Sequence, residues 1–578
     1  MDSSRIRTLL ITLGIFGLVY FFVVRPSSTP PARSLPERPV PTAQQRGAER
    51  VEQVRSGTLV ADVSTYSGAI RQYRIDAPQF SSSHRLVQGT RWWQRDEHPG
   101  FSTTDREPFF PLRTNIEFRR AGINVLPAYL TFDEVRRDGD GLTLIAHLRE
   151  QQVEVHRTIK PHTQYAFAVS TRVINHGPAG ELRASQGVYH WIPRKQEEGQ
   201  FFSQSWRRAE GLCHHNGRLQ RVTREDMSKA AQDNDGVARN SNYVGLANMY
   251  FLQALVPQGE VAACHLHAED RGAGDQLGSV MFAQLSWTPV QLATGESHDY
   301  RVLSYFGPKH APHLAAASPE LKDALDLGMF AFIARGLLKL LQFLQTIVKN
   351  WGVAIMLLTL IVRTALFPLL ARSMKSMAAM QKLKPELDAL NEKFADDQNA
   401  KGLATMELYR KHGVNPVAGC LPQMAQLPVW WALYTTLQTS IEIYHQPFAL
   451  WIRDLSSPDP FFVLPLVLGA VMFIQQKIMP PASPDPMQAK IMFWFLPIFL
   501  TVISLFLPAG LALYMLVNSV LAIIQQKITK AQIDKMTTDI GGGPDDKGIK
   551  VRPAPATSGS GSGKGSKGGK GTKQLPGR

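Results

Sequence analysis

Residues 352–370 form an apolar run, GVAIMLLTLIVRTALFPLL, that is long enough to cross a lipid bilayer. The run contains Arg363, whose charge costs about 2.5–3.5 kcal/mol inside a bilayer on insertion scales and roughly 10–17 kcal/mol on an isolated helix in simulation. An arginine near a helix end can also snorkel to the headgroups without serving any function. Thr359 lies one turn away on the same face, and polar residues recur in the other apolar segments. The pattern therefore favours helices that surround a hydrated space within the membrane.

Six apolar segments in all are expected to span the membrane. The first follows Arg5 and Arg7, a pattern that fits a secretory signal as well as an anchor, but its length and the lack of a nearby cleavage site favour an uncleaved span. Lys and Arg cluster before the first span, after the second, between the fourth and fifth, and after the sixth, which predicts that both termini are cytoplasmic. The five later spans are predicted at 352–370, 418–438, 461–478, 491–507 and 509–525.

The chain between and beyond these spans divides by composition. We predict an N-terminal transmembrane anchor at 1–25, a Pro- and Arg-rich linker at 26–56, a soluble domain outside the cytoplasm at 57–315, an amphipathic interfacial helix at 316–350, a five-helix membrane core at 351–535 and a disordered basic cytoplasmic tail at 536–578.

The soluble domain is expected to be rich in β-strands. In YAFAVSTRV, alternate residues from Tyr165 to Val173 are apolar or small, which is the period of a half-buried strand. The segments 142–148 and 153–159 alternate in the same way, with turn residues between them. A sandwich of strands is the natural outcome for a domain of this length.

A cytoplasmic helical hairpin is predicted at 373–415, within the membrane core. Met374, Met377 and Met380 begin an apolar stripe at helical spacing that continues through leucines to Phe394. Such a stripe can be the packing seam of the hairpin, or methionine can make it an adaptable surface that captures apolar client segments.

The net charge of +15 suits an acidic partner, namely anionic lipid or ribosomal RNA. Nothing in the chain points to DNA. The disordered tail is basic, which is typical of segments that meet anionic lipid at a membrane surface.

The three cysteines cannot make a disulfide framework, because Cys420 lies at a membrane border. Cys213 and Cys264 each precede histidines, but their spacing matches no zinc motif. Two unrelated thiols are the favoured reading, a Cys213–Cys264 bridge is the alternative, and no metal site or cofactor is expected. No nucleophile elbow, phosphate loop or metalloprotease helix is present, so the chain is not expected to be an enzyme.

Polar residues in the spans form the candidate site. No Asp or Glu lies in any predicted span to neutralise Arg363. Polar residues in spans often do no more than bridge helices, but a set that includes a cation needs water or a ligand to solvate it. The candidate substrate-binding residues are Arg363, Thr359, Gln423, Gln426, Tyr514 and Asn518.

The membrane part resembles the YidC/Oxa/Alb family of membrane protein insertases. The resemblance runs in order through NWGVAIMLLTLIVRTALFPL, VNPVAGCLPQMAQLPVWWALY, QPFALWIRDLSSPDPFFVLP, DPMQAKIM and PAGLALYMLVNSV, over about 350–530. The opening MDSSR, the large outer domain and NSNYVGLANMYFLQALVP resemble the Gram-negative bacterial YidC form.

The resemblance implies a periplasmic β-supersandwich similar to sugar-binding folds, and a multi-pass protein of the bacterial inner membrane. It implies that Arg363 belongs to a hydrophilic groove closed on the outside, with Thr359 and Tyr514 contacting substrate. Met515 stands where many relatives have a second aromatic residue, which puts one stacking contact in doubt. The implied partners are nascent membrane proteins, the Sec translocon and the ribosome.

Two other classes of function remain open from the residues alone. A transporter or channel is one, although five core spans do not divide into the equal repeats that transporters favour. A membrane-anchored periplasmic sugar-modifying enzyme is the other, although no convincing carboxylate pair supports it.

Overall fold

The computed structural model describes residues 47–77, 110–120, 123–125, 130–149, 151–193, 209–233, 237–271, 278–394, 398–412, 416–478 and 486–540. The predicted anchor at 1–25 and the tail from 541 onward lie outside the described residues. The chain divides into two compact units, of which the first holds Met1–Leu366, Met424–Met479 and Pro486–Ile523, and the second holds Phe367–Gln423, Pro480–Asp485 and Ile524–Arg578.

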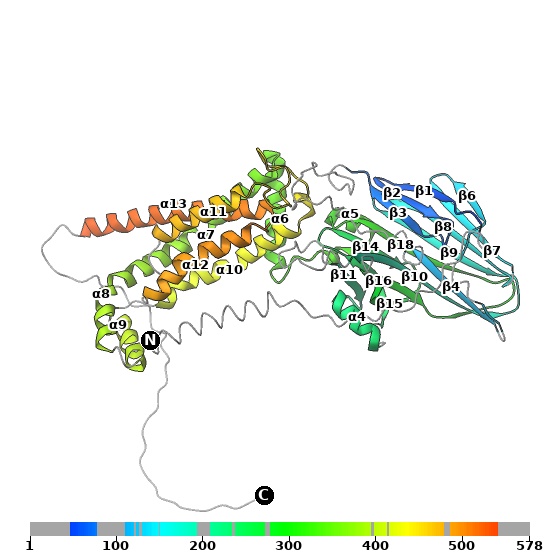
Figure 1. Cartoon of the computed structure of the whole chain (residues 1–578), viewed down its shortest axis with the longest axis horizontal. Helices are drawn as coiled ribbons and strands as arrows, with labels where there is room; N and C mark the ends of the chain where they lie inside the picture. The colour runs from blue at the N-terminus through cyan, green and yellow to red at the C-terminus, as the bar shows by residue number, and fades with distance from the viewer. Residues whose placement is uncertain are drawn as a thin grey trace, which may run out of the picture. The chain divides into compact units, whose positions relative to one another are not determined.

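The soluble part of the first unit is built from antiparallel strands, as the alternating sequence predicts (Figure 1). Its strands are β1 Val51–Ser56, β2 Leu59–Ser64, β3 Ile70–Ile75, β4 Arg113–Arg120, β5 Ile123–Val125, β6 Glu134–Asp138, β7 Gly141–Leu148, β8 Val153–Thr163, β9 Ala166–Asn175, β10 Gly180–Pro193, β11 Glu210–His215, β12 Arg218–Thr223, β13 Val237–Ala247, β14 Phe251–Pro257, β15 Ala262–Arg271, β16 Gly278–Trp287, β17 Val290–Leu292 and β18 Ser297–Pro308.

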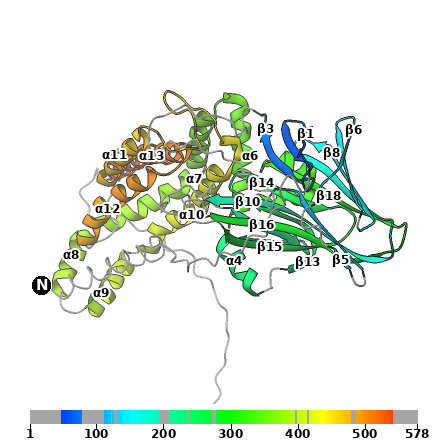
Figure 2. The same ribbon diagram turned by 45° about the vertical axis from the view of Figure 1, so that its right-hand side comes forward.

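These strands form two sheets. The small sheet has the order β1-β2-β3, and the 15-stranded sheet runs β5-β4-β10-β16-β15-β13-β14-β18-β9-β8-β7-β6, with β11, β12 and β17 pairing off this path. Figure 2 shows β10, β16 and β15 side by side in this order. One helix, α4 (Arg224–Asp233), packs against β15. We refer to this part of the chain, from β1 to β18, as the β domain.

The period-two prediction for β9 is confirmed. The side chains of Tyr165, Phe167, Val169, Thr171 and Val173 are all at most 2% exposed, so they line the core. The strands predicted at 142–148 and 153–159 are β7 and β8, which pair in register from Leu142↔Ile159 to Leu148↔Val153.

The linker predicted at 26–56 is wrong at its C-terminal end. Val51–Ser56 is strand β1, paired with β2 from Val51↔Ser64 to Ser56↔Leu59. The composition of this strand resembles that of a linker, because Glu52, Gln53 and Arg55 are polar. Its alternate residues Val54 and Ser56 are nevertheless buried in the core, each at 2% exposure.

A buried cation that the sequence did not single out lies in the β domain. Arg157 is 0% exposed, and its guanidinium donates to Thr114 Oγ1, to Thr171 Oγ1 at 3.3 Å and to the carbonyl oxygen of Leu112 at 2.6 Å. A buried guanidinium must satisfy its donors within the protein. The bonds of Arg157 therefore connect β8 to β9, to β4 and to Leu112, which lies just before β4.

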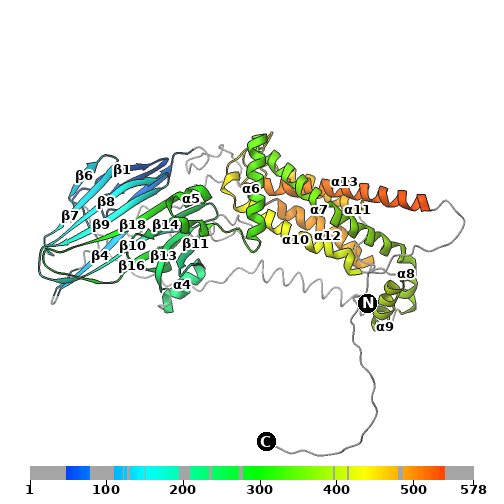
Figure 3. The same cartoon turned by 180° about the vertical axis from the view of Figure 1, so that it is seen from behind.

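The interfacial helix predicted at 316–350 begins later than expected. The chain forms the short helices α5 (Ala311–Ala317) and η5 (Pro319–Ala324), and only then α6 (Ala331–Val348). Gly328, at φ +69°, turns the chain between η5 and α6. Figure 3 shows α6 running across the helices of the bundle near the start of α7, as in Figure 1.

Five further helices form the bundle, and they match the five predicted core spans. They are α7 Trp351–Lys382, α10 Pro416–Thr439, α11 Val463–Ile478, α12 Pro486–Ser504 and α13 Ala509–Ile540. By length and composition, the described segments Ala331–Val348, Trp351–Leu369 and Ala509–Thr529 can cross a membrane, and Val463–Ile478 and Phe493–Ser504 are shorter apolar helices. The number of six spans stays a prediction, as does the interfacial position of α6.

The second unit contains the region that is predicted to be a cytoplasmic hairpin. The helices α8 (Lys384–Lys393) and α9 (Gln398–Lys411) form a hairpin, in which His412 Nε2 lies 3.3 Å from Glu386 Oε2. The residues from 373 to 382 are not a separate helix but the end of α7. At the other end of the core, α13 runs to Ile540 and so extends five residues into the predicted tail.

Candidate functional site

The structure brings Arg363 and Asn518 together from helices far apart in sequence. Arg363 lies on α7, and its Nε donates a hydrogen bond of 2.8 Å to Asn518 Oδ1 on α13. Tyr514 lies one turn before Asn518 on the same helix and is 3% exposed. Because Asn518 is a neutral amide, this bond orients the guanidinium without cancelling its charge.

Thr359 lies one turn from Arg363 on α7 but does not offer its proton to a ligand. Its side chain is 2% exposed, and Oγ1 donates to the carbonyl oxygen of Ile355 at 2.7 Å. A hydroxyl that bonds back to its own helix satisfies its donor locally and leaves only acceptor capacity.

The remaining predicted site residues lie on described helices, but their side chains are outside the described set. Gln423 and Gln426 lie on α10. Met374, Met377 and Met380 lie on the last three turns of α7, in the second compact unit. Their roles in substrate contact and client capture stay predictions.

Arg363 lies where the packing of α7 changes. On the side towards Trp351, the residues Ala354, Ile355 and Leu358 are at most 1% exposed and join one apolar cluster with residues of α6, α10 and α13. On the other side, Thr364, Ala365 and Pro368 are exposed. The bundle is therefore closed by packed apolar side chains on the Trp351 side of Arg363, and none of the described α7 residues beyond Arg363 is buried.

The closed end is completed by the loop between α10 and α11. Asp454 Oδ1 accepts hydrogen bonds from the backbone N–H and hydroxyl of Ser456 at 2.8 and 2.6 Å, and its Oδ2 lies 3.0 Å from His445 Nδ1. The N–H of Gly510, at the start of α13, donates to the carbonyl oxygen of Leu455 at 2.8 Å. These bonds hold the loop against the helix ends.

Gly352 permits the close approach of this loop to α7. We therefore expect Gly352→Ala to destabilise the protein by about 1–3 kcal/mol through overpacking. A Cβ at this position would overlap the Phe448 ring, whose backbone carbonyl is held by Asn350 Nδ2 at 2.8 Å. Thermal unfolding in detergent measures the effect.

Gly336→Ala is the matched control, because a Cβ there meets nothing within 4 Å. In the middle of α6, this change should raise stability by up to about 1 kcal/mol. Equal unfolding temperatures for the two variants would contradict the close-packing argument.

The favoured reading of Cys213 and Cys264 as unrelated thiols is wrong in this structure. They form a disulfide that joins β11 to β15, with their Cα atoms 6.2 Å apart. Each precedes a histidine in the sequence, but with both sulfurs bonded to each other neither is a thiolate ligand. Among the described residues, no group of three or more His, Cys, Asp or Glu could hold a metal ion.

Comparison with known proteins covers both parts of the chain. The family described as "60Kd inner membrane protein" matches residues 343–536, and the family described as "YidC periplasmic domain" matches residues 131–340. The first family is thus one of inner membrane proteins, and the second is a periplasmic domain whose match covers β6 to β18.

Curated relatives that share one description match half of the chain or more. "Membrane protein insertase YidC" of Anaeromyxobacter dehalogenans (strain 2CP-1) is 44% identical over 292 residues, 50% of this chain and 51% of the relative. The protein of that name from Vibrio atlanticus (strain LGP32) is 36% identical over 375 residues, 64% of this chain and 67% of the relative. The chain thus spans about half the length of the first relative and two thirds of the second.

A crystal structure of an active YidC insertase with its first transmembrane domain resolved covers 84% of this chain and 95% of its own at 20% identity, with a TM-score of 0.33. The family assignment depends on the two family matches and on the relatives' sequence identity. The chain belongs to the YidC family.

Proposed function

We propose that this chain is a membrane protein insertase and chaperone, which inserts nascent inner-membrane proteins and helps them fold, alone or with the Sec translocon. Membership of the YidC family supports the proposal. The observation that carries it is the position of Arg363, a cation oriented by Asn518 just beyond the packed apolar cluster of the bundle. Neither a soluble domain nor an anchor needs a cation there.

The apolar part of a client slides along the lipid-facing sides of the bundle. Trp494, Ile498 and Val502 on α12 are 53%, 50% and 45% exposed, and Trp431 on α10 is 45% exposed. Such apolar surface is stable in contact with lipid tails. A client helix that packs beside it exchanges lipid for protein as its apolar neighbour, at little cost in free energy.

The polar outer tail of the client enters a hydrophilic groove beside Arg363. Water and the guanidinium lower the cost of taking its polar groups out of solvent. An acidic tail is attracted to Arg363 and then driven outward by the membrane potential, about 2.3 kcal/mol per charge per 100 mV. The apolar seal from Ala354 to Leu358 is the barrier that the tail must pass.

The cytoplasmic side delivers the client in this proposal. Both termini are cytoplasmic, the β domain is periplasmic, and the ends of α7 and α13 lead into the region that meets the ribosome. Met374, Met377 and Met380 present soft apolar side chains to varied client helices. The basic tail binds anionic lipid or ribosomal RNA.

Purified protein in liposomes tests the proposal. An insertase protects the outer tail of a small single-span client from external protease, and does so in proportion to protein reconstituted. A channel would instead release a trapped solute, and a sugar-modifying enzyme would convert an oligosaccharide. Solute flux or sugar turnover without protection of the client would overturn the proposal.

Asn518→Asp separates the charge of Arg363 from its hydrogen bonding. The carboxylate keeps an acceptor 2.8 Å from Arg363 Nε but neutralises the guanidinium. We expect insertion of a client with an acidic tail to fall about tenfold, the loss of one charge-assisted contact. Insertion of a client with a neutral tail should change much less.

Asn518→Gln is the control, because it keeps a neutral amide on α13. The measurement is the ratio of the insertion rates of two clients that share one helix and differ only in an acidic or a neutral tail. If Asn518→Asp slows both clients equally, the positive charge of Arg363 is not what attracts the tail.

A further inference from the structure

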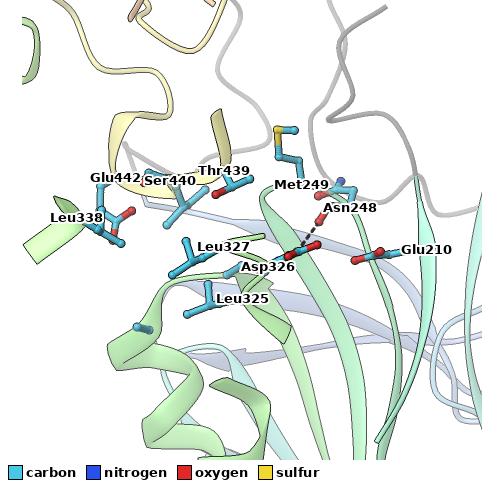
Figure 4. A pocket seen from close by; sticks show the side chains of 13 residues that line it. Glu210, Asn248, Met249, Leu325, Asp326, Leu327, Leu338, Thr439, Ser440 and Glu442 are labelled. Atoms are coloured by element: carbon cyan, nitrogen blue, oxygen red, sulfur yellow. Dashed lines mark hydrogen bonds between the residues drawn. The ribbon is translucent and has the colours of Figure 1, made fainter. Parts of the chain in front are cut away.

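A cavity of about 210 Å³ lies within the first compact unit, apart from Arg363 (Figure 4). Asn248 lines it from the β domain, and Lys309 is the residue that follows β18. Asp326 lines it from the segment before α6, and Ser440 and Glu442 line it from the segment that follows α10. A water molecule occupies about 30 Å³ of liquid, so there is room for about seven waters or for a small organic group.

Lys309 is held rigidly at the wall of this cavity. It is 6% exposed, its Nζ donates to the backbone carbonyl of Asn248 at 3.0 Å, and its backbone N–H donates to the carbonyl of Tyr250 at 2.7 Å. An ammonium has three N–H donors. Among the residues that the structure describes, no carboxylate oxygen lies within 4.0 Å of Lys309 Nζ. The cavity is where its remaining donors can find an acceptor.

The acids nearest to Lys309 are engaged by Arg221. Arg221 Nη1 pairs with Glu210 Oε1, and its Nε lies 4.0 Å from Asp326 Oδ2. Arg221 thus offsets part of the charge of the two acids, which together still favour the charged form of the Lys309 amine. Burial lowers the pKa of Lys309 to about 8, so the amine is mainly charged at pH 7.

The other wall of the cavity carries a carboxylate. Glu442 is 8% exposed and accepts a hydrogen bond of 2.8 Å from Gln342 Nε2 on α6. Apolar side chains, among them Met249, Leu325 and Leu338, also line the cavity. A cation, a carboxylate and apolar side chains around one cavity fit a zwitterion that carries both an anionic group and an ammonium.

The position of the cavity indicates which zwitterion can reach it. Thr439, the last residue of α10, and Leu338, on α6, both line it. Phe332 and Phe343 of α6 are 88% and 59% exposed, which suits a helix lying on lipid. In the orientation proposed above, this is the level of the outer headgroups of the bilayer.

We propose that this cavity binds the headgroup of an outer-leaflet phospholipid of the phosphatidylethanolamine class, with the phosphodiester at Lys309 and the ammonium at Glu442. The proposal rests on the proposed orientation but not on insertase activity. The shared chemistry is phosphoethanolamine, so a soluble headgroup is the rival source. Choline lacks the N–H donors that a carboxylate binds, and glycerol lacks the charge.

Native mass spectrometry of the full chain tests this, after exchange into detergent with equal amounts of phosphatidylethanolamine, phosphatidylcholine and phosphatidylglycerol. We expect the ethanolamine lipid to be retained preferentially. Lys309→Met should lower its retention about tenfold, the loss of a charge-assisted contact. Ala311→Leu, which fills the cavity without changing charge, should lower it as well. Lys322→Met, at an exposed lysine of η5, is the matched control and should change nothing.

Retention that is equal in wild type, Lys309→Met and Ala311→Leu would overturn the proposal, as would equal retention of the three lipids. If Lys309→Met does not fold, Ala311→Leu carries the test. Displacement of the bound lipid by equimolar soluble phosphoethanolamine would overturn the lipid as the source. Insertion assayed on the same samples keeps the two proposals apart, because selective lipid binding without insertion would contradict only the proposed function.

Discussion

Arg363→Ala is expected to lower the insertion of a client with an acidic outer tail by about 10- to 100-fold, while the protein accumulates at nearly its normal level. The factor corresponds to the roughly 1.5–3 kcal/mol of a hydrogen bond to a charged group. Removing the guanidinium also removes a donor that holds Asn518 Oδ1. The measurement is protection of the client's tail in proteoliposomes, with clients that differ only in tail charge.

Thr364→Ala is the matched control for this change. Thr364 follows Arg363 on α7, is exposed, and donates its hydroxyl to the carbonyl of Leu360 in its own helix at 2.8 Å. It should insert clients normally. If Arg363→Ala instead collapses protein abundance, or slows acidic, neutral and basic tails equally, Arg363 is a structural residue.

The second large effect is expected in the β domain. Replacing both Cys213 and Cys264 with alanine should cost about 4 kcal/mol, since in the chain-entropy model a bridge between residues 51 positions apart removes that much freedom from the unfolded state. For a domain of this size, the unfolding midpoint should fall by roughly 10 °C. Both residues are 1% exposed, so the loss of packing adds to the effect.

Thiol alkylation under denaturing conditions, before and after reduction, checks that the bond is present. We expect one reactive thiol, Cys420, before reduction and three after it. Cys420→Ala should leave the midpoint of the β domain unchanged. Three reactive thiols without any reductant would contradict the disulfide.

Regular elements could be predicted from sequence where burial is periodic. The core face of β9 follows from alternation in a nine-residue stretch, and the five bundle helices follow from apolar runs. Boundaries were less accurate. The strand β1 falls in the predicted linker because its buried positions include a serine, and α6 begins fifteen residues after the predicted start at 316 because the turn at Gly328 carries no apolar signal.

The sequence predicts the members of the candidate site but not their contacts. The unusual cost of a charge in an apolar run singles out Arg363, and polar side chains within a predicted span add Tyr514 and Asn518. The pairing of Arg363 with Asn518 does not follow from the sequence, because the two residues lie 155 positions apart and only the packing of α7 and α13 brings them together. The role of Thr359 in the groove stays a prediction, and its hydroxyl donates to the carbonyl oxygen of Ile355 in its own helix.

Sequence alone thus determined the class of this protein: apolar segments around a charged residue, an alternating outer domain and a basic tail. Those properties are local, because bilayer partitioning and strand alternation act on neighbouring residues. The tertiary structure decided which polar groups meet, as in the Arg363–Asn518 bond, the Cys213–Cys264 bridge and the cavity at Lys309. Contacts between distant segments depend on the packing of whole elements, which no local pattern records.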